Sequence, residues 1–327
     1  MRRRMTGWGW RAGALALGIV GLLAALGALT SVAAPTADAF LSPAFERVWT
    51  RTDWLVKYAG LPRAWYWGPD PRRDTWEVFD EAPGHIRHVQ YFDKSRMEPN
   101  VLILQGTPQP TPPPNSQWAV TNGLLVVELI AGEQQLGAAR FVPYHDANIP
   151  LASDVDAPTG PTYTTFRALS NTPVGFHPAP DRSGATVVAL IVNRSGQVQA
   201  DPSKASYGVT DVHYVPETQH NIPGVFWGFL NAVGPVREDG QVSSQQLSDP
   251  WFFATGLPIS EAYWARVKVA GQQKDVLIQA FERRVLTYNP TNPTGFQVEM
   301  GNVGLHYFDW RYPNGLPGPV PTSTAGP

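Results

Sequence analysis

The sequence predicts an α+β protein that is mainly β. Two tandem small modules, each a short aromatic helix followed by a small antiparallel sheet, flank a turn-rich β segment. Composition indicates a folded chain with many turns, because the 327 residues include 32 Pro and 30 Gly yet are 43% hydrophobic and 11% aromatic. Disordered chains are poor in aromatic residues. The other two observations are an internal repeat and short apolar segments with the alternation typical of strands.

The internal repeat covers most of the chain between residues 40 and 312. Two pairs of identical residues lie 189 positions apart: Gln90 with Gln279, and Phe92 with Phe281. Two further pairs lie 178 positions apart: Val120 with Val298, and Gly123 with Gly301. The difference of 11 positions equals the length of the Pro-rich segment 106–116, GTPQPTPPPNS, which accounts for the change as an insertion. The order of these matches indicates a duplication.

The first module, residues 40–146, is predicted to begin with a helix. Ser42 is a suitable N-cap, and Pro43 suits the first helical position. Three apolar residues then follow at i, i+3 and i+4 and share one face: Phe45, Val48 and Trp49. Further along, the segment 121–132, TNGLLVVELIAG, is apolar enough for a buried helix or a buried strand, and its pattern leaves both open.

The second module, residues 215–312, repeats this layout. Its predicted helix follows Pro223 and presents three apolar residues with the same spacing: Phe226, Phe229 and Leu230. Apolar and polar residues alternate over 264–269, which predicts a strand. A turn at 270–273 leads to a return strand over 275–281, and a further strand is expected over 285–288. In the turn-rich segment 147–214, strands are expected within 185–193 and 209–215.

The N-terminus has the layout of a secretory signal. A positive region comes first and contains four arginines: Arg2, Arg3, Arg4 and Arg11. Residues 12–29 are uncharged and apolar, and two small-x-small sites follow, at 31–33 and 37–39. We therefore expect residues 1–39 to be a signal peptide; the alternative is an uncleaved N-terminal membrane anchor. Either way, the protein is predicted to be extracellular or in the cell envelope, with residues 313–327 forming a disordered Pro/Gly/Ser/Thr tail.

Composition and motifs exclude several function classes. The chain has no cysteine, which excludes disulfides, Cys-type zinc fingers and cysteine nucleophiles. A net charge of -2 provides no basic surface for nucleic acid. The sequence contains no G-x-S-x-G elbow, no H-E-x-x-H and no Gly-rich phosphate loop. We therefore expect a protein that is not an enzyme and has no cofactor.

Residues 215–304 resemble the LGFP-type repeats of secreted and wall-associated bacterial proteins. The matching positions form an aromatic helix, a Gly-x-Pro turn, a strand end and a closing hook: Gly256, Leu257, Pro258, Gln279, Phe281, Glu282, Arg283 and Gly304. The first copy carries the strand end as Gln90, Phe92, Asp93 and Lys94, but Trp67-Gly68-Pro69 replaces its Gly-x-Pro turn. The whole body also resembles uncharacterised secreted bacterial proteins with this motif order. The resemblance implies a role at the cell envelope, on wall polymers, and no catalytic residues.

The acid–base pairs at the two strand ends have a structural interpretation. Asp93-Lys94 and Glu282-Arg283 each follow a core phenylalanine, so we expect them to form a hydrogen-bonding corner. Nothing in their spacing indicates a pair of catalytic carboxylates.

Five tryptophans fall within 28 residues of the first module: Trp49, Trp54, Trp65, Trp67 and Trp76. Trp65 and Trp67 would share one face of an extended segment. Exposed rings in a row stack against sugar faces, which makes these residues candidates for a ligand-binding platform. The alternative is that they fill the core of a small module.

One local cluster contains residue types that bind metals. It reads D-x-H-x3-E-x2-H and comprises Asp211, His213, Glu217 and His220. Such nitrogen and oxygen ligands suit a divalent metal. The alternative, which we favour, is a structural role: these residues are polar groups flanking a helix start, with no metal bound.

These features together predict a secreted or surface-attached, non-enzymatic protein. It would bind cell-wall or surface polysaccharide, or another surface partner, through its LGFP-like modules. It would bind no nucleic acid and would contact a membrane only through an uncleaved N-terminal segment. The first alternative is a purely structural envelope protein, and the second is a secreted metal-dependent hydrolase that uses the cluster around His213.

Overall fold

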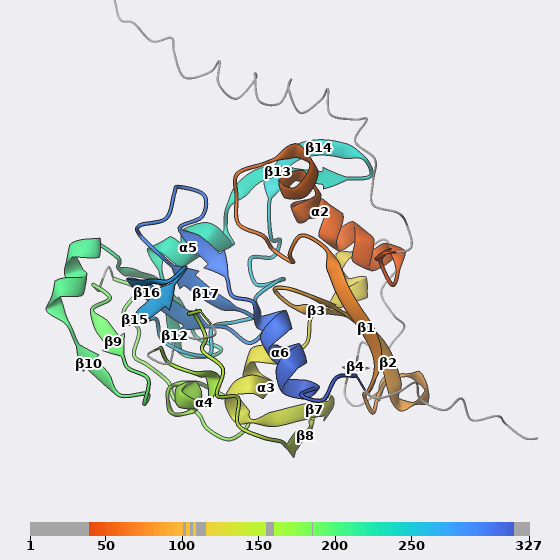
Figure 1. Cartoon of the computed structure of the whole chain (residues 1–327), viewed down its shortest axis with the longest axis horizontal. Helices are drawn as coiled ribbons and strands as arrows, with labels where there is room; N and C mark the ends of the chain where they lie inside the picture. Colours follow the sequence, from red (N-terminus) through yellow and green to blue (C-terminus); the bar gives the residue numbers. More distant parts are fainter. Residues whose placement is uncertain are drawn as a thin grey trace, which may run out of the picture.

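The computed structural model of the chain describes residues 39–100, 103–104, 107–108, 116–154, 160–184 and 186–316. The predicted signal or anchor, most of the Pro-rich segment and residues 317–327 of the predicted tail lie outside the described residues. The predicted fold class is confirmed, since short helices accompany several small antiparallel sheets (Figure 1). In the described part of the chain, no helix is both long and apolar enough to span a membrane.

The first copy forms a helix, a four-stranded antiparallel sheet and a closing helix. Its elements are α2 (Pro43–Ala59), β1 (Pro71–Val78), β2 (Ile86–Phe92), β3 (Arg96–Pro99), β6 (Val120–Thr121) and α3 (Leu125–Ala131), with sheet order β1-β2-β3-β6. Helix α2 begins as predicted, because the Ser42 side chain accepts a hydrogen bond from the backbone N–H of Phe45. It ends at Gly60, whose φ of 65° is left-handed and favours glycine. The segment 121–132, whose sequence pattern allowed either a helix or a strand, contains helix α3.

The second copy repeats the same order of elements. They are α5 (Gly224–Leu230), β15 (Tyr263–Val269), β16 (Gln272–Ala280), β17 (Val285–Tyr288), β18 (Val298–Met300) and α6 (Val303–Arg311). Strand β9 (Leu190–Val192) of the central segment pairs parallel with β15, and β10 (Val198–Ala200) extends the sheet beyond it. The full order is β10-β9-β15-β16-β17-β18.

The remaining described elements are short. They are the hairpins β7 (Glu133–Gly137) with β8 (Arg140–Pro143), β11 (Asp211–Val215) with β12 (His220–Pro223), β13 (Val233–Glu238) with β14 (Gln241–Gln246), and β4 (Ile103–Leu104) with β5 (Thr107–Pro108). The short helices are α4 (Tyr163–Phe166), η2 (Pro83–His85), η3 (Gln117–Ala119), η4 (Arg167–Leu169) and η5 (Pro202–Tyr207).

Strand register supports the duplication, including its insertion. In the first copy, Pro99 pairs with Val120, and in the second, Tyr288 pairs with Val298. These are the positions that the offsets of 189 and 178 relate. The first strands of the two copies also correspond, since Trp76 on β1 pairs with His88 as Trp264 on β15 pairs with Leu277. Trp76 and Trp264 therefore occupy the same place in the two sheets.

The two copies share their cores. Each of the two buried hydrophobic clusters contains residues of both copies, for example Phe92 with Phe281 in one and Tyr91 with Tyr307 in the other. Helix α6 of the second copy packs on β2 of the first (Figure 1). The hydroxyl of Tyr307 donates a hydrogen bond of 2.6 Å to Glu128 Oε2 on α3. The sheets therefore belong to one packed body.

Equivalent corners of the two copies also touch each other. The N–H of Phe92 donates to the carbonyl of Ser95 (2.7 Å), and Phe281 makes the matching bond to Arg284 (2.8 Å). Ser95 and Arg284 are themselves equivalent, and the Arg284 guanidinium donates to the Ser95 hydroxyl. A contact between equivalent positions indicates an approximate two-fold relation between the copies.

The repeated glutamines hold the chain that enters each module. Gln90 Nε2 donates to the Ala39 carbonyl and Gln90 Oε1 accepts from the Leu41 N–H, both at 2.9 Å. Gln279 Nε2 donates to the Asn221 carbonyl at 2.7 Å, but its buried Oε1 has no partner in the described structure. The position equivalent to Leu41 is Pro223, which has no N–H to donate.

A buried ionic cluster occurs in the first copy. Arg96 Nη1 lies 2.7 Å from Glu77 Oε2, and Arg96 Nε lies 2.7 Å from Glu98 Oε1. The Tyr312 hydroxyl, just beyond α6, donates to Glu77 Oε1 at 2.9 Å. The cluster therefore ties the end of the second copy to the first sheet.

Candidate functional site

The predicted tryptophan platform is not formed. Trp49, Trp54 and Trp67 are buried, so the prediction that they bind a ligand is wrong. The physical reason is that the apolar face of α2 and the segment after it pack into the shared core. Trp65 is half-buried, and only Trp76 is exposed, on β1. The core-filling alternative holds for three of the five rings.

The four predicted metal candidates do not form a site. In the part of the chain that the structure describes, no group of three or more His, Cys, Asp or Glu side chains could hold a metal ion. His220 is buried, and its Nδ1 lies 3.1 Å from Glu261 Oε1. Asp211 is also buried, with Oδ2 3.4 Å from Arg182 Nε. Burial and the charge of Glu261 raise the pKa of Asp211 to about 6.

The other two candidates point elsewhere. The His213 ring stacks on Trp227, with centroids 3.9 Å apart and an interplanar angle of 15°. Glu217 lines a cleft between the two copies. Asp211 and His220 therefore share the neighbour Glu261, whereas His213 lies on Trp227 and Glu217 lines the cleft, so the four residues do not converge on one point.

The strand-end motifs form close-packed corners in both copies. Gly256 has a φ of 69°, and a Cβ built on it would lie 2.8 Å from the Cβ of Glu282. Glu282 Oε2 accepts the N–H of Leu257 at 3.0 Å. Gly68 has a φ of 124°, and its Cβ would lie 2.9 Å from that of Asp93. Gly68 thus plays the part of Gly256 in the first copy, although the turn there is one residue shorter.

A cleft of about 520 Å³ lies where residues 118–122 of the first copy, which we call its hook, meet the corner formed by Gly256 and Glu282 in the second. We call it the Trp118 cleft. Its aromatic lining consists of Trp118, Phe252 and Phe253. Its polar lining includes Asn100, Glu217, Glu282 and Arg283. Trp118 is 43% exposed and Phe252 37%, so both rings face solvent over a substantial part of their surface.

Short-range hydrogen bonds place Trp118 at the edge of the cleft. The residue lies in η3, where its N–H donates to the Ser116 hydroxyl at 3.1 Å. The Asn100 side chain donates to the Trp118 carbonyl at 2.8 Å. The Trp118 ring then meets Phe253 edge to face, with centroids 5.5 Å apart. This ring orientation is one that aromatic pairs favour.

Ring contacts continue from the cleft across α5. Phe252 contacts Trp251 at 5.4 Å, Trp251 contacts Trp227 at 5.4 Å, and Trp227 carries the stacked His213. We call His213, Trp227, Trp251 and Phe252 the aromatic strip. Trp227 and Trp251 are half-buried, so each ring is anchored on one side and reaches solvent on the other. The strip lengthens the apolar surface available to a ligand in the cleft.

The polar groups of the Trp118 cleft carry both charges. Arg283 Nη1 donates to the Thr121 hydroxyl at 2.9 Å, which orients the guanidinium across the junction of the copies. Glu217 comes from the turn between β11 and β12, and Glu282 from the end of β16. Amide, carboxylate and guanidinium groups beside exposed rings suit a ligand with one apolar face and hydroxyl groups at its edge.

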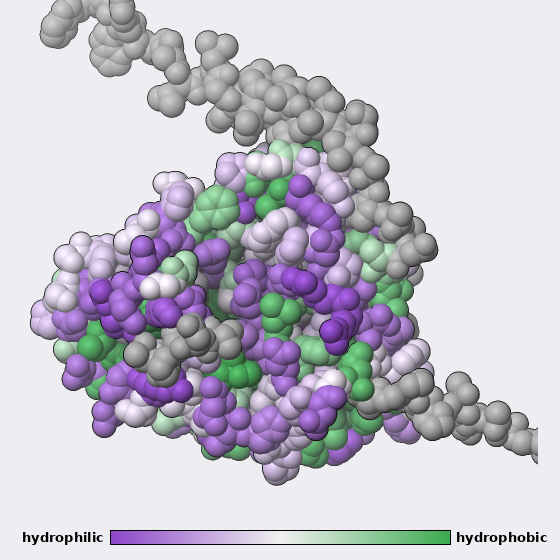
Figure 2. All heavy atoms as spheres, in the orientation of Figure 1, coloured by the Kyte–Doolittle hydropathy of each residue, from purple (hydrophilic) through white to green (hydrophobic). Residues whose placement is uncertain are grey.

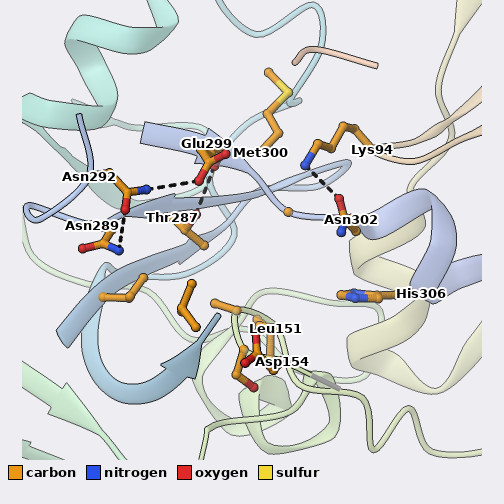
Figure 3. A pocket seen from close by; sticks show the side chains of 15 residues that line it. Lys94, Leu151, Asp154, Thr287, Asn289, Asn292, Glu299, Met300, Asn302 and His306 are labelled. Carbon is orange, nitrogen blue, oxygen red and sulfur yellow. Dashed lines mark hydrogen bonds between the residues drawn. The ribbon is translucent and has the colours of Figure 1, made fainter. Parts of the chain in front are cut away.

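The approximate two-fold relation produces a second pocket, of about 250 Å³ (Figure 3). Lys94 stands here in the place of Arg283, Asn289 in that of Asn100 and Glu299 in that of Thr121. Lys94 Nζ donates to Asn302 Oδ1 at 2.8 Å (Figure 3). Burial lowers the pKa of Lys94. This pocket is polar and has no Trp, Tyr or Phe among its described lining residues.

The chain matches no known family model, no curated protein and no solved structure. The site is therefore defined by its own geometry.

Sequence reasoning missed the residues of the cleft and the strip. Residues 49–76 contain many tryptophans, but three of these rings, Trp49, Trp54 and Trp67, are buried in the core. Trp118 lies two residues after Ser116 in the short helix η3, and Trp251 and Phe252 follow Pro250 in a turn. The sequence does contain one indication of this site. Its aromatic residues lie next to residues typical of turns, where no periodic face can bury them.

Proposed function

We propose that the protein is secreted or attached to the cell surface and that it binds cell-envelope polysaccharide, without catalysis, through the Trp118 cleft. The observation that carries the proposal is the pair of exposed rings, Trp118 and Phe252, on a cleft that also presents Glu217, Glu282 and Arg283. A pyranose offers an apolar face to a ring and hydroxyls to charged and amide groups. The aromatic strip provides contacts for neighbouring sugars of a chain.

The expected affinity for a single sugar is modest. An aromatic stacking contact contributes about 0.5–1.5 kcal/mol beyond the area that it buries. Polymers repeat the same unit, so several weak contacts act at high effective concentration. Retention on a polysaccharide should therefore be much stronger than binding of its monosaccharide.

The sequence supports the cellular location. The positive N-terminus, the uncharged segment 12–29 and the small-x-small sites favour export. The resemblance of Gly256-Leu257-Pro258 and Gln279-x-Phe281-Glu282-Arg283 to LGFP-type repeats supports a place on wall polymers. The absence of the sequence motifs for nucleophilic or metal hydrolases favours a binding role over catalysis.

The test is retention of the purified chain from residue 39 onward on bacterial cell-wall material and on a glycan array. The double variant Trp118→Ala/Phe252→Ala should lower retention at least tenfold, because it removes both exposed rings of the cleft. Trp76→Ala is the matched control, since it removes an exposed tryptophan from another sheet and should leave retention unchanged.

Three results would contradict the proposal. The wild-type chain would show no retention on either material, the double variant would bind as well as wild type, or Trp76→Ala would cause the loss. Release of reducing sugars during the incubation would point to the hydrolase alternative, and replacing Glu217 or Glu282 by Gln would then identify the carboxylate involved.

A further inference from the structure

The pocket that is related to the Trp118 cleft by the two-fold presents opposite charges that do not pair with each other. Lys94 comes from the corner between β2 and β3 of the first copy, and Glu299 from β18 of the second. Among the described residues, neither side chain belongs to an ion pair. The Lys94 ammonium donates instead to the neutral side-chain oxygen of Asn302, at 2.8 Å. We call this cavity the Lys94 pocket.

The Lys94 pocket opens to solvent and is small. On the face drawn in Figure 2, the surface is hollowed near its middle, where Figure 1 places α6 beside β17, and hydrophilic side chains surround the hollow. The volume of about 250 Å³ lies just below the range of about 300–1,000 Å³ that is typical of pockets for drug-sized ligands. A ligand of this pocket is therefore a small molecule.

The two charges stand on opposite sides of the pocket. Figure 3 shows Lys94, Asn302 and His306 on one side, and Glu299 with Asn292 on the other. Glu299 Oε2 accepts a long hydrogen bond of 3.4 Å from Asn292 Nδ2, and no described residue donates to Oε1. An ammonium has three N–H groups, of which Asn302 uses one at Lys94. Both charged groups therefore keep hydrogen-bonding capacity for a ligand.

The Trp118 cleft shows what the same two positions do when they bond each other. There, Arg283 and Thr121 stand in the places of Lys94 and Glu299, and a hydrogen bond of 2.9 Å joins them. In the Lys94 pocket these places hold opposite charges, yet the lysine turns to Asn302. Opposite charges that share a pocket without pairing leave space for a ligand that bonds both.

The other acids near the pocket are already engaged. Asp154, which also lines it, accepts the N–H of Gly271 at 2.8 Å, and this bond lowers the pKa of the carboxyl. Asp93, at the corner of the first copy, is paired with Arg72 at 2.5 Å. Glu299 is thus the acid that is left for a cationic group of the ligand.

His306 adds a neutral hydrogen-bond donor on the side of Lys94. Its Nδ1 lies 3.0 Å from the hydroxyl of Tyr163, a residue that is fully buried. The hydroxyl has no other acceptor among the described residues, so it donates to Nδ1 and the ring proton is on Nε2. Burial, followed by the charge of Lys94, lowers the pKa of His306 to about 4, so the ring is neutral at pH 7. Figure 3 shows this ring reaching into the pocket.

We propose that the Lys94 pocket binds a small amino acid, with its carboxylate on Lys94 and His306 and its ammonium on Glu299. Each end of such a zwitterion gains charge-assisted hydrogen bonds, which are the strong ones. A simple anion would leave Glu299 unpaired, and a simple cation would leave Lys94 unpaired. The described lining has no Trp, Tyr or Phe on which a sugar ring stacks, which separates this site from the Trp118 cleft.

Isothermal titration calorimetry of the purified protein tests the proposal. The probes are glycine, β-alanine and γ-aminobutyrate, whose two charges are successively further apart, with butyrate and butylamine as ligands of a single charge. At least one zwitterion should bind, on the order of tenfold more tightly than butyrate or butylamine. No saturable binding of any zwitterion up to about 10 mM, or equal binding of butyrate or butylamine, would overturn the proposal.

Two variants assign the ends of the ligand. Lys94→Met should remove the advantage of the zwitterion over butylamine, and Glu299→Gln its advantage over butyrate, because each deletes one of the two charges. Comparing ligands within one variant keeps the test valid if that variant is less stable. Arg140→Met, at an exposed ion pair on β8, is the control and should bind as wild type does.

An unchanged preference for the zwitterion in both variants would overturn the assignment of this pocket. Cell-wall retention, with its loss in Trp118→Ala/Phe252→Ala, tests the proposed function separately, because neither of those rings lines the Lys94 pocket.

Discussion

The two copies of the repeat agree in their corners and differ on their outer faces. Both use a glycine pressed against the acid after the strand, a glutamine that holds the entering chain, and the same pairing of the third and fourth strands. They differ at the tryptophan of the first strand, since Trp264 is fully buried and Trp76 is 50% exposed. The positions that hold backbone groups match between the copies, and the exposure of the equivalent tryptophans does not.

A second difference lies beneath the sheets. Glu77, Arg96 and Glu98 of the first copy correspond to Ala265, Val285 and Thr287 of the second. One copy therefore builds an ionic cluster where the other builds a largely apolar layer. The two solutions fit together because the cluster also binds Arg311, the last residue of α6 in the second copy, and Tyr312, the residue after it. The two copies therefore stabilise each other, because residues of the second copy bind the ionic cluster of the first.

The largest expected effect comes from making the first copy resemble the second at position 96. Arg96→Val should lower the free energy of unfolding by about 5 kcal/mol, because it removes the buried guanidinium that bridges Glu77 and Glu98 and leaves them only Arg311 and Arg87. Urea denaturation measures it. Adding Glu77→Gln and Glu98→Gln should recover part of the loss, and Arg72→Met, at an exposed ion pair, should cost less than about 1 kcal/mol. Two separate unfolding transitions in the variant would contradict a shared core.

The matched tryptophans give the next largest effect. Trp264→Ala should cost about 4 kcal/mol, because it removes a buried ring and leaves a cavity under Tyr207. Trp76→Ala should cost less than about 1 kcal/mol, because half of the ring is exposed. The difference between the two values, from urea denaturation, measures the difference in burial. Equal costs would remove the asymmetry on which the comparison depends.

Acid should weaken the first copy through Glu77. Burial alone would raise the pKa of this carboxyl, but Arg311, Arg96 and Arg87 lower it to about 2, from an ordinary value of 4.5. A depressed pKa stabilises the folded state above pH 4.5, and that contribution is lost as the pH falls from 4.5 toward 2. The full loss is about 3 kcal/mol, at about 1.4 kcal/mol for each unit of pKa.

The measurement is the free energy of unfolding at several pH values between about 6 and about 2, a range that includes the ordinary and the folded-state pKa of Glu77. Glu77→Gln should be less stable than wild type at pH 6 and should lose less on acidification. A variant with the same acid dependence as wild type would show that Glu77 stays protonated, or equally charged, in both states.

The smallest of these effects tests the repeat motif itself. Gly256→Ala should cost about 2 kcal/mol, because the left-handed backbone disfavours a side chain and the added Cβ would press on Glu282. Gly60→Ala is the control: its φ is also positive, but no atom lies within 4 Å of the added Cβ, so it should cost about 1 kcal/mol. Equal costs would mean that the corner is not close-packed.

Local structure was largely predictable from the sequence. The cap at Ser42, the strand alternation over 264–269 and the offsets of the repeat all describe contacts between near neighbours or identical positions, and the structure contains them. Sequence pattern sets these features because periodicity and turn chemistry act over a few residues.

The site was less predictable, because it depends on how the copies meet. Arg283 faces Thr121 and Glu282 shares a cleft with Trp118 only because the hook of one copy packs on the corner of the other. No local pattern encodes that crossing. Burial of Trp49, Trp54 and Trp67 follows from the same crossing, since the shared core needs their rings.

The most direct test is a footprint of the individual tryptophans with and without solubilised cell-wall polysaccharide. If the Trp118 cleft and the aromatic strip bind the polymer, oxidation of Trp118 and Trp251 slows on its addition, while oxidation of Trp76 does not change. An unchanged rate at Trp118, or protection of Trp76 alone, would contradict the assignment of polysaccharide binding to this cleft.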